Sequence, residues 1–153
     1  MTENALRVSV DRLSGIEGTA FGPSSWREVP QESVDLFARV TGDHNPIHLD
    51  ADFAAQTPFG TRIVHGLLTL GLVVPLMAEV FEVTGASMGV NYGLNRVRFP
   101  APVPVGSRIR VRGEVASVTA VTGGWQLEVP VVFELEGGGK PACVAELVLR
   151  YYA

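Results

Sequence analysis

"GLLTLGLVVPLMA", residues 66–78, is the longest apolar run of the chain and the stretch from which its fold can be read. At 13 residues it is too short to span a bilayer and has the length of a buried core helix. The pattern predicts a helix from Gly66 to Glu82 that is apolar on nearly every side and therefore lies at the centre of the fold. We expect Pro75 to kink this helix, because proline removes one backbone donor and crowds the preceding turn.

The chain changes character on either side of this run. After Gly85, apolar and polar residues alternate in long stretches that predict strands. Within the third stretch, apolar residues from Trp125 to Leu135 share one face, and Pro130 on the other face indicates an edge strand or a bulge. The expected strands cover residues 88–99, 108–118, 123–139 and 141–152. Earlier in the chain the patterns predict a short strand over 24–29 and helices over 30–42 and 49–60.

Early helices followed by long antiparallel strands predict an α+β domain with the helices on one face of the sheet. A length of 153 residues suits one domain with one core. We therefore expect a single domain over residues 25–153, in which a curved antiparallel sheet wraps the long central helix. Residues 1–24 are weakly patterned and rich in Gly, Ser and Thr, so we expect an N-terminal arm there.

Charge and cysteine content narrow the functional classes. The formal net charge of −4 argues against a nucleic-acid partner, and no apolar run is long enough for a membrane span. The single cysteine, Cys143, fits a reducing cytoplasm, and no signal-peptide pattern opens the chain. One cluster of basic residues is suited to a small anionic ligand: Arg96, Arg98, Arg108, Arg110 and Arg112.

The stretch "TGDHNPIHLD", residues 41–50, concentrates titratable side chains around a proline. Pro46 restricts the backbone, so a stiff turn can aim Asp43 and His48 at one point. A carboxylate and an imidazole that converge can hold a water and exchange its protons, which is general acid–base chemistry. A plain structural turn after a helix is the other interpretation. We expect no metal here, because the spacing lacks the helical His pair or the cysteine set of common metal sites.

A second candidate is "IVHGLL", residues 63–68, at the start of the predicted central helix. Glycine allows a substrate carbonyl to approach the backbone, and the free N–H of Gly66 at a helix start could polarise it. A simple helix entry explains the same residues. We expect His65 to be structural or to form a wall of the site.

These two stretches carry a family resemblance. "TGDHNPIHLD" followed by "FGTRIVHGLLTLGL" resembles the MaoC-like dehydratases, the (R)-specific enoyl-CoA hydratases of the hot-dog fold. Their signature runs Gly-Asp-x-Asn-Pro-x-His and continues with a His-Gly at the entrance of the hot-dog helix. "NYGLNRVRFPAPVPVGSRIR" and "KPACVAELVLRYYA" look like single-domain actinobacterial members, a group also related to nodulation protein N.

The resemblance implies a role for each matching position. Asp43 and His48 correspond to the catalytic pair, and Gly66 to the residue whose N–H binds the thioester oxygen. Asn45 corresponds to a position that shapes the active-site loop or serves the structure alone. Some relatives carry a serine further along the central helix. Residues 66–86 contain none, so that hydroxyl is missing or is replaced by the hydroxyl of Thr69.

The implied protein is a homodimeric hydratase that adds water reversibly to a trans-2-enoyl thioester and gives the (R)-3-hydroxyacyl thioester. It would need no metal or redox cofactor, because the substrate, an acyl-CoA or an acyl-carrier-protein thioester, makes its own C2 proton acidic. One alternative is a 3-hydroxyacyl-carrier-protein dehydratase of fatty-acid or polyketide synthesis. A hot-dog thioesterase and a non-catalytic acyl-thioester binder are the others, and the intact Asp43 and His48 argue against both.

Overall fold

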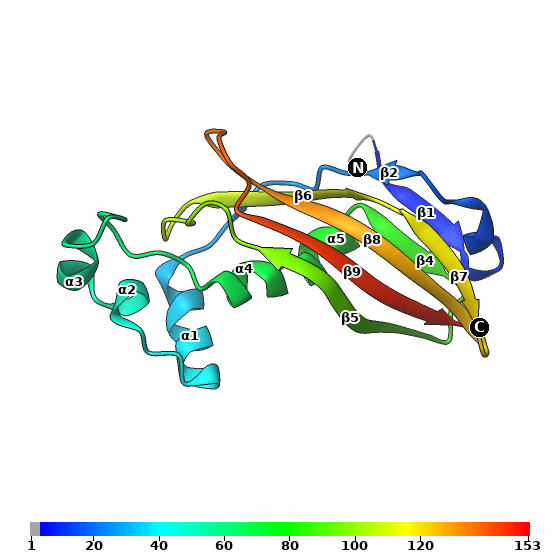
Figure 1. The fold of residues 1–153 in the computed structure, drawn as a ribbon, viewed down its shortest axis with the longest axis horizontal. Coiled ribbons are helices and arrows are strands. Elements are labelled where there is room, and N and C mark those ends of the chain that lie inside the picture. Colours follow the sequence, from blue (N-terminus) through cyan, green and yellow to red (C-terminus); the bar gives the residue numbers. More distant parts are fainter. Residues whose placement is uncertain (1–3) are drawn as a thin grey trace.

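Figure 1 shows the fold in a computed structural model, which describes residues 4–153. Over these residues the main sheet has seven antiparallel strands in the order β2–β6–β8–β9–β5, with β3 also paired to β6 and β7 to β8. Its strands are β2 (Ala20–Phe21), β3 (Arg27–Glu28), β5 (Met88–Arg98), β6 (Arg108–Glu114), β7 (Ser117–Val121), β8 (Gly124–Leu135) and β9 (Cys143–Tyr152). A smaller parallel pair joins β1 (Leu6–Ser9) and β4 (Phe81–Thr84).

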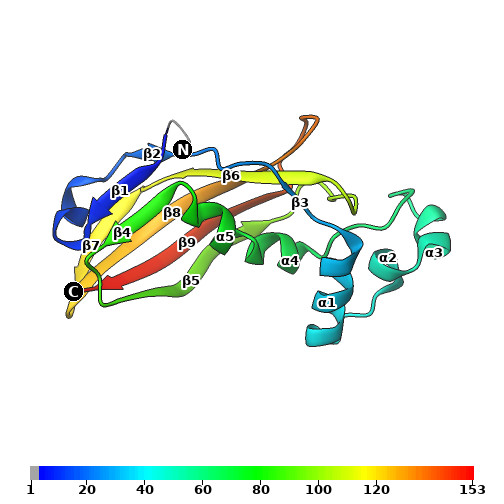
Figure 2. The same ribbon diagram turned by 180° about the vertical axis from the view of Figure 1, so that it is seen from behind.

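The α-helices lie on one face of this sheet and at one of its ends. Two views from opposite sides agree that α1, α2 and α3 project beyond the end of the sheet, while α4 and α5 lie against it (Figures 1 and 2). The helices are η1 (Val10–Gly15), α1 (Gln31–Thr41), α2 (Pro46–Leu49), α3 (Ala51–Ala55), α4 (Gly66–Gly71) and α5 (Val73–Ala78). The predicted α+β architecture is therefore confirmed.

The central helix differs from its prediction. It was expected to run from Gly66 to Glu82, but it is interrupted at Leu72 and ends at Ala78. The interruption has a local cause, because the ring of Pro75 crowds the carbonyl of the residue four positions earlier, which is Gly71. Beyond the helix, the β-favouring residues of β4 form a strand that pairs with β1.

The strands predicted from the alternation are confirmed, except that one of them is divided into two. Leu127, Val129 and Phe133 of β8 are fully buried on the predicted inner face. The expected strand 108–118 is divided into two strands, β6 and β7. Between them, the three residues 114–116 lie opposite only two residues of β8, 129 and 130, so the chain forms a bulge. Pro130 lies opposite this bulge, in a strand that has neighbours on both sides. Of the two predicted explanations for this proline, the bulge is therefore correct and the edge strand is wrong.

The first part of the chain contributes to the same core as the rest. Residues 6–21 hold β1, η1 and β2, where an irregular arm was expected. The side chains of Val10, Leu13 and Phe21 are buried in the hydrophobic core. The proposed domain division at residue 24 stays a prediction, but no break in packing coincides with it among the described residues.

One edge of the sheet is apolar and uncovered. β5 pairs only with β9 within residues 4–153, and most of its side chains are exposed. Large apolar side chains are exposed on this strand, at its end and on the adjacent helices: Leu67, Val74, Met88, Tyr92, Leu94 and Phe99. Among residues 4–153, every helix falls short of the length and apolar character that crossing a membrane requires.

Candidate active site

The motif of residues 41–50 is shaped by bonds between side chains and its own backbone. α1 ends as predicted at Gly42, whose left-handed φ of 77° turns the chain. Asp43 follows, and its Oδ1 accepts a hydrogen bond from the N–H of Asn45 (3.3 Å). The Oδ1 of Asn45 accepts in turn from the N–H of Ile47 (3.2 Å), which caps α2. Asn45 therefore has the contacts of a residue that shapes the loop.

His48 lies on the single helical turn α2, where the sequence analysis expected a stiff turn without a helix. It is buried, with 7% of its surface exposed. Its Nδ1 lies 2.6 Å from the carbonyl oxygen of Ile63. Because a carbonyl only accepts, Nδ1 carries the proton, and Nε2 is left with the lone pair of a base.

The surroundings of His48 favour its neutral form. Burial is the largest influence and lowers its pKa, and the neighbouring His65 lowers it further, while the bond to Ile63 and the charge of Asp43 act in the opposite direction. The net result is a pKa below the ordinary value of 6.5. At neutral pH the imidazole is therefore present as a base.

His65 contacts both His48 and the backbone of Asp43. It is 2% exposed and stacks on the ring of His48 at a centroid distance of 3.8 Å, with the ring of Phe37 at 4.8 Å. Its Nε2 lies 3.1 Å from the backbone carbonyl of Asp43, so it donates a hydrogen bond there. His65 thus contacts both members of the predicted pair, which fits the expectation of a structural or wall residue.

The side chains of Asp43, His48 and His65 converge. One potential ligand atom from each lies within 4.8 Å of the others, and the side chain of Asp43 remains half exposed. A metal would need both imidazole lone pairs directed at one point. The stacked rings are tilted by only 31°, and the Nε2 of His65 is committed to a carbonyl. The arrangement therefore suits proton transfer better than metal binding.

Gly66 opens α4 at the wall of a pocket of about 390 Å³. His48 and Thr69 line the same pocket, and the backbone N–H of Gly66 has no hydrogen-bond partner within residues 4–153. A Cβ atom at Gly66 would lie 3.1 Å from the ring of Phe99, so a side chain there would narrow the pocket. Thr69 is 1% exposed, and its hydroxyl is unpartnered among the described residues.

Several parts of this site could not be read from the sequence. The sequence around Ile63 and Phe99 has no pattern that predicts a contact of the Ile63 carbonyl with His48 or of the Phe99 ring with Gly66. Phe37 gave a partial signal, because it lies on the apolar stripe predicted for the helix over 30–42. Asp43 itself does not line the pocket of Gly66 in the described chain.

The basic cluster is only partly available for a ligand. Arg108 forms an ion pair with Glu136, and both Arg110 and Arg112 contact Glu134. Cys143, the one thiol of the chain, is buried in the core, which raises its pKa to about 11. It is therefore unsuited to act as a nucleophile.

Comparison with known proteins agrees with this geometry. Residues 13–133 match the family described as the MaoC like domain. The chain is 48% identical over 146 residues to 3-hydroxyacyl-thioester dehydratase Z of Mycobacterium tuberculosis, covering 95% of this chain and 97% of that protein. It is 40% identical over 135 residues to nodulation protein N of Rhizobium leguminosarum, covering 86% and 83%.

A solved structure with a similar fold is the (R)-hydratase from A. caviae involved in PHA biosynthesis. It superposes with a TM-score of 0.70 at 26% identity and covers 84% of this chain and 92% of that one. The chain belongs to the MaoC-like dehydratase family, and the predicted hot-dog fold is confirmed. The expectation of an enzyme of the hydratase and dehydratase class is confirmed with it.

Proposed function

We propose that this protein is an (R)-specific enoyl-CoA hydratase, which interconverts trans-2-enoyl and (R)-3-hydroxyacyl thioesters in the cytoplasm. The observation that carries the proposal is the position of His48, which lines the pocket of Gly66 and has a ring nitrogen within 4.8 Å of a carboxylate oxygen of Asp43. The 48% identical relative is named a 3-hydroxyacyl-thioester dehydratase, which supports an acyl thioester as substrate.

The chemistry assigns one task to each group. In hydration, the Nε2 of His48 takes a proton from the water held between the pair, and the water oxygen forms the bond to C3. The proton then passes from His48 to Asp43, which delivers it to C2, so both groups return to their starting forms and the net change is the addition of one water. The N–H of Gly66 stabilises the negative charge that builds on the thioester oxygen. No cofactor is required, because the thioester itself makes the C2 proton acidic.

We further propose that the protein is a homodimer joined through β5. An edge strand with unpaired backbone groups and exposed apolar side chains on both faces favours pairing with a second strand. Light scattering should give about twice the monomer mass of 16.4 kDa. A fully active monomer would contradict this proposal.

The test of the reaction is turnover of crotonyl-CoA, followed by loss of enoyl absorbance, with chiral analysis of the product. Asp43→Asn and His48→Gln should each lower kcat/KM by about 10²- to 10⁴-fold while the melting temperature changes little. His44→Gln is the matched control, since this exposed histidine of the same motif lies outside the cluster. Near wild-type turnover by either variant of the pair would reject the assignment.

The alternatives predict other results. A carrier-protein dehydratase would turn over crotonyl-carrier protein far faster than crotonyl-CoA. A thioesterase would release free thiol, and a binding protein would show neither reaction.

A further inference from the structure

The outer face of the sheet carries a long depression, which we name the outer trough. It consists of two pockets of about 490 and 460 Å³ that share Val132 and Val144. These two valines alternate along β8 and β9 with buried residues such as Phe133 and Cys143. The trough therefore lies on the face of the sheet that points away from the core.

Positive charge is concentrated around the outer trough. Two acidic residues, Glu134 and Glu146, line it. Its basic residues are Arg96, Arg98, Arg110, Arg112 and Lys140. In a chain of net charge −4, the remaining seven basic residues are outnumbered by fourteen acidic ones. A concave, positively charged surface on an acidic protein attracts and retains anions.

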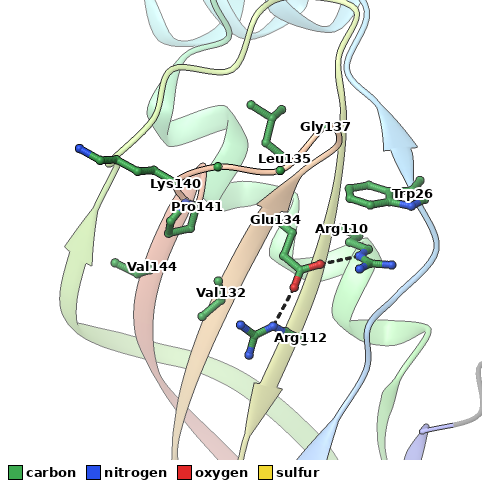
Figure 3. Close-up of a pocket in the computed structure, with 12 residues that line it drawn as sticks. Trp26, Arg110, Arg112, Val132, Glu134, Leu135, Gly137, Lys140, Pro141 and Val144 are labelled. Atoms are coloured by element: carbon green, nitrogen blue, oxygen red, sulfur yellow. Dashed lines mark hydrogen bonds and ion pairs between the residues drawn. The ribbon is translucent and has the colours of Figure 1, made fainter.

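Within the trough, one carboxylate orients two guanidinium groups (Figure 3). The Nε of Arg110 lies 2.6 Å from one oxygen of Glu134, and the Nε of Arg112 lies 2.8 Å from the other. Their terminal Nη groups have no hydrogen-bond partner within residues 4–153. Two fixed forks with free donors are well suited to the oxygens of a phosphate.

The ion pairs leave this group charged. Partial burial alone would raise the pKa of Glu134, but the hydrogen bonds and charges of Arg112 and Arg110 lower it overall. Glu134 thus neutralises one of the two guanidinium charges and one positive charge remains. Trp26 fixes Arg110 from the other side, with the guanidinium carbon 4.3 Å from the ring centre.

The outer trough ends close to the candidate active site. Pro141 lines the trough, and the next residue, Ala142, lines the pocket of Gly66. The N–H of Ala101, which also lines that pocket, donates to the carbonyl of Pro141 (3.1 Å). Consecutive residues of the chain therefore line the two cavities at this end of the sheet.

We propose that the outer trough binds the phosphorylated nucleotide end of coenzyme A, with Arg110, Arg112 and Lys140 contacting its phosphates, while the thioester occupies the pocket of Gly66. The proposal rests on the proposed function, because it assumes an acyl-CoA substrate. Among the arginines of the sequence cluster, it excludes Arg108, which is held in an ion pair with Glu136 through both Nε and Nη2.

The shape of the trough favours a nucleotide over the acidic surface of a carrier protein. Its floor between Lys140 and the two arginines is apolar, with Val132, Val144 and Pro141. An amphipathic ligand with phosphates at its ends fills such a cavity, whereas a folded carrier protein would meet only its rim.

The first experiment measures binding without any reaction. Adenosine 3′,5′-bisphosphate is titrated calorimetrically into the wild-type protein and into Arg112→Gln, Lys140→Glu and the control Arg108→Gln. We expect the first two variants to weaken binding by roughly tenfold, the scale of one lost charged hydrogen bond, and the control to bind as the wild type does. Lys140 is exposed in the glycine-rich connection before β9, so its variant tests the proposal even where Arg112→Gln lowers stability.

The second experiment compares crotonyl-CoA with crotonyl-pantetheine, which lacks the nucleotide. In both trough variants the KM for crotonyl-CoA should rise about tenfold more than the KM for crotonyl-pantetheine. Equal changes for the two substrates, or unchanged bisphosphate binding in both variants, would overturn the proposal. A higher KM for crotonyl-carrier protein with unchanged bisphosphate binding would also overturn it, in favour of a carrier-protein surface.

The two proposals fail in different ways. A wild-type protein that turns over no enoyl thioester would refute the proposed function. Bisphosphate binding that depends on Arg112 and Lys140 would still support the trough as a nucleotide site in that case.

Discussion

The sheet and the loop of residues 41–50 hold their shapes by different means. Side chains such as Leu127 and Phe133 define the sheet because they are removed from water. In the loop, Asp43 and Asn45 are exposed, and their carboxylate and amide oxygens accept hydrogen bonds from backbone N–H groups, which fixes the chain. Burial stabilises one region and the proposed proton transfer belongs to the other, so substitutions in the two should affect different measurements.

The largest effect on stability is expected in the sheet. Phe133→Ala removes a fully buried ring from the middle of β8 and should cost about 3–5 kcal/mol of unfolding free energy. The melting temperature should fall by about 10 °C. Phe53→Ala, on the exposed surface of α3, is the control and should change it little. Equal melting temperatures for the two variants would remove the distinction between the regions.

A side chain at position 66 should lower activity much more than stability. Gly66→Val places carbon atoms against the ring of Phe99, which is 41% exposed and can move. We expect kcat/KM to fall by roughly 10²-fold, the scale of losing one oxyanion donor, with a melting temperature within a few degrees of wild type. Turnover and melting must be measured on the same sample. A stable and nearly fully active variant would place the thioester oxygen elsewhere.

Asn45 tests the loop itself. Asn45→Ala removes the cap of α2 and should cost about 1 kcal/mol, measured as a shift of the urea midpoint. Asn45→Asp retains an acceptor and should behave like the wild type in this measurement. If both variants unfold at the same urea concentration as the wild type, the cap contributes nothing to the loop.

The smallest effect concerns pH. In the proposed reaction His48 must be neutral to take a proton, and burial together with His65 lowers its pKa below 6.5. The acid limb of kcat/KM should therefore lie below pH 6.5 in the wild type. His65→Gln removes the repulsion between the two imidazoles, so the limb should move to higher pH. The same limb in wild type and variant would show that His65 does not influence His48; His44→Gln should leave it unmoved.

The same contrast explains what the sequence could predict. Alternation identified the inner face of β8 because burial repeats every second residue. The central helix was predicted too long, since the conflict between Pro75 and Gly71 and the pairing of β4 with β1 depend on geometry that an apolar run does not encode.

In the candidate site, the motif predicted that Asp43 and His48, five positions apart, come together, and the structure places a ligand atom of each within 4.8 Å of the other. The stacking of His48 on His65 was not visible, because seventeen positions separate them and only the folded chain brings them together. The contact between the carbonyl of Ile63 and His48 was hidden for the same reason, and also because backbone groups leave no mark in a sequence.

The uncovered strand β5 has a consequence for how this protein behaves at low concentration. A folded state that requires a second copy is populated according to mass action, so its apparent stability grows with the amount of protein present. We expect the melting temperature to rise with protein concentration and the chain to lose order on dilution. In the proposed homodimer, the same strand would stay exposed during synthesis until a second copy arrives, so the amount of newly made chain would affect how much of it reaches the native state.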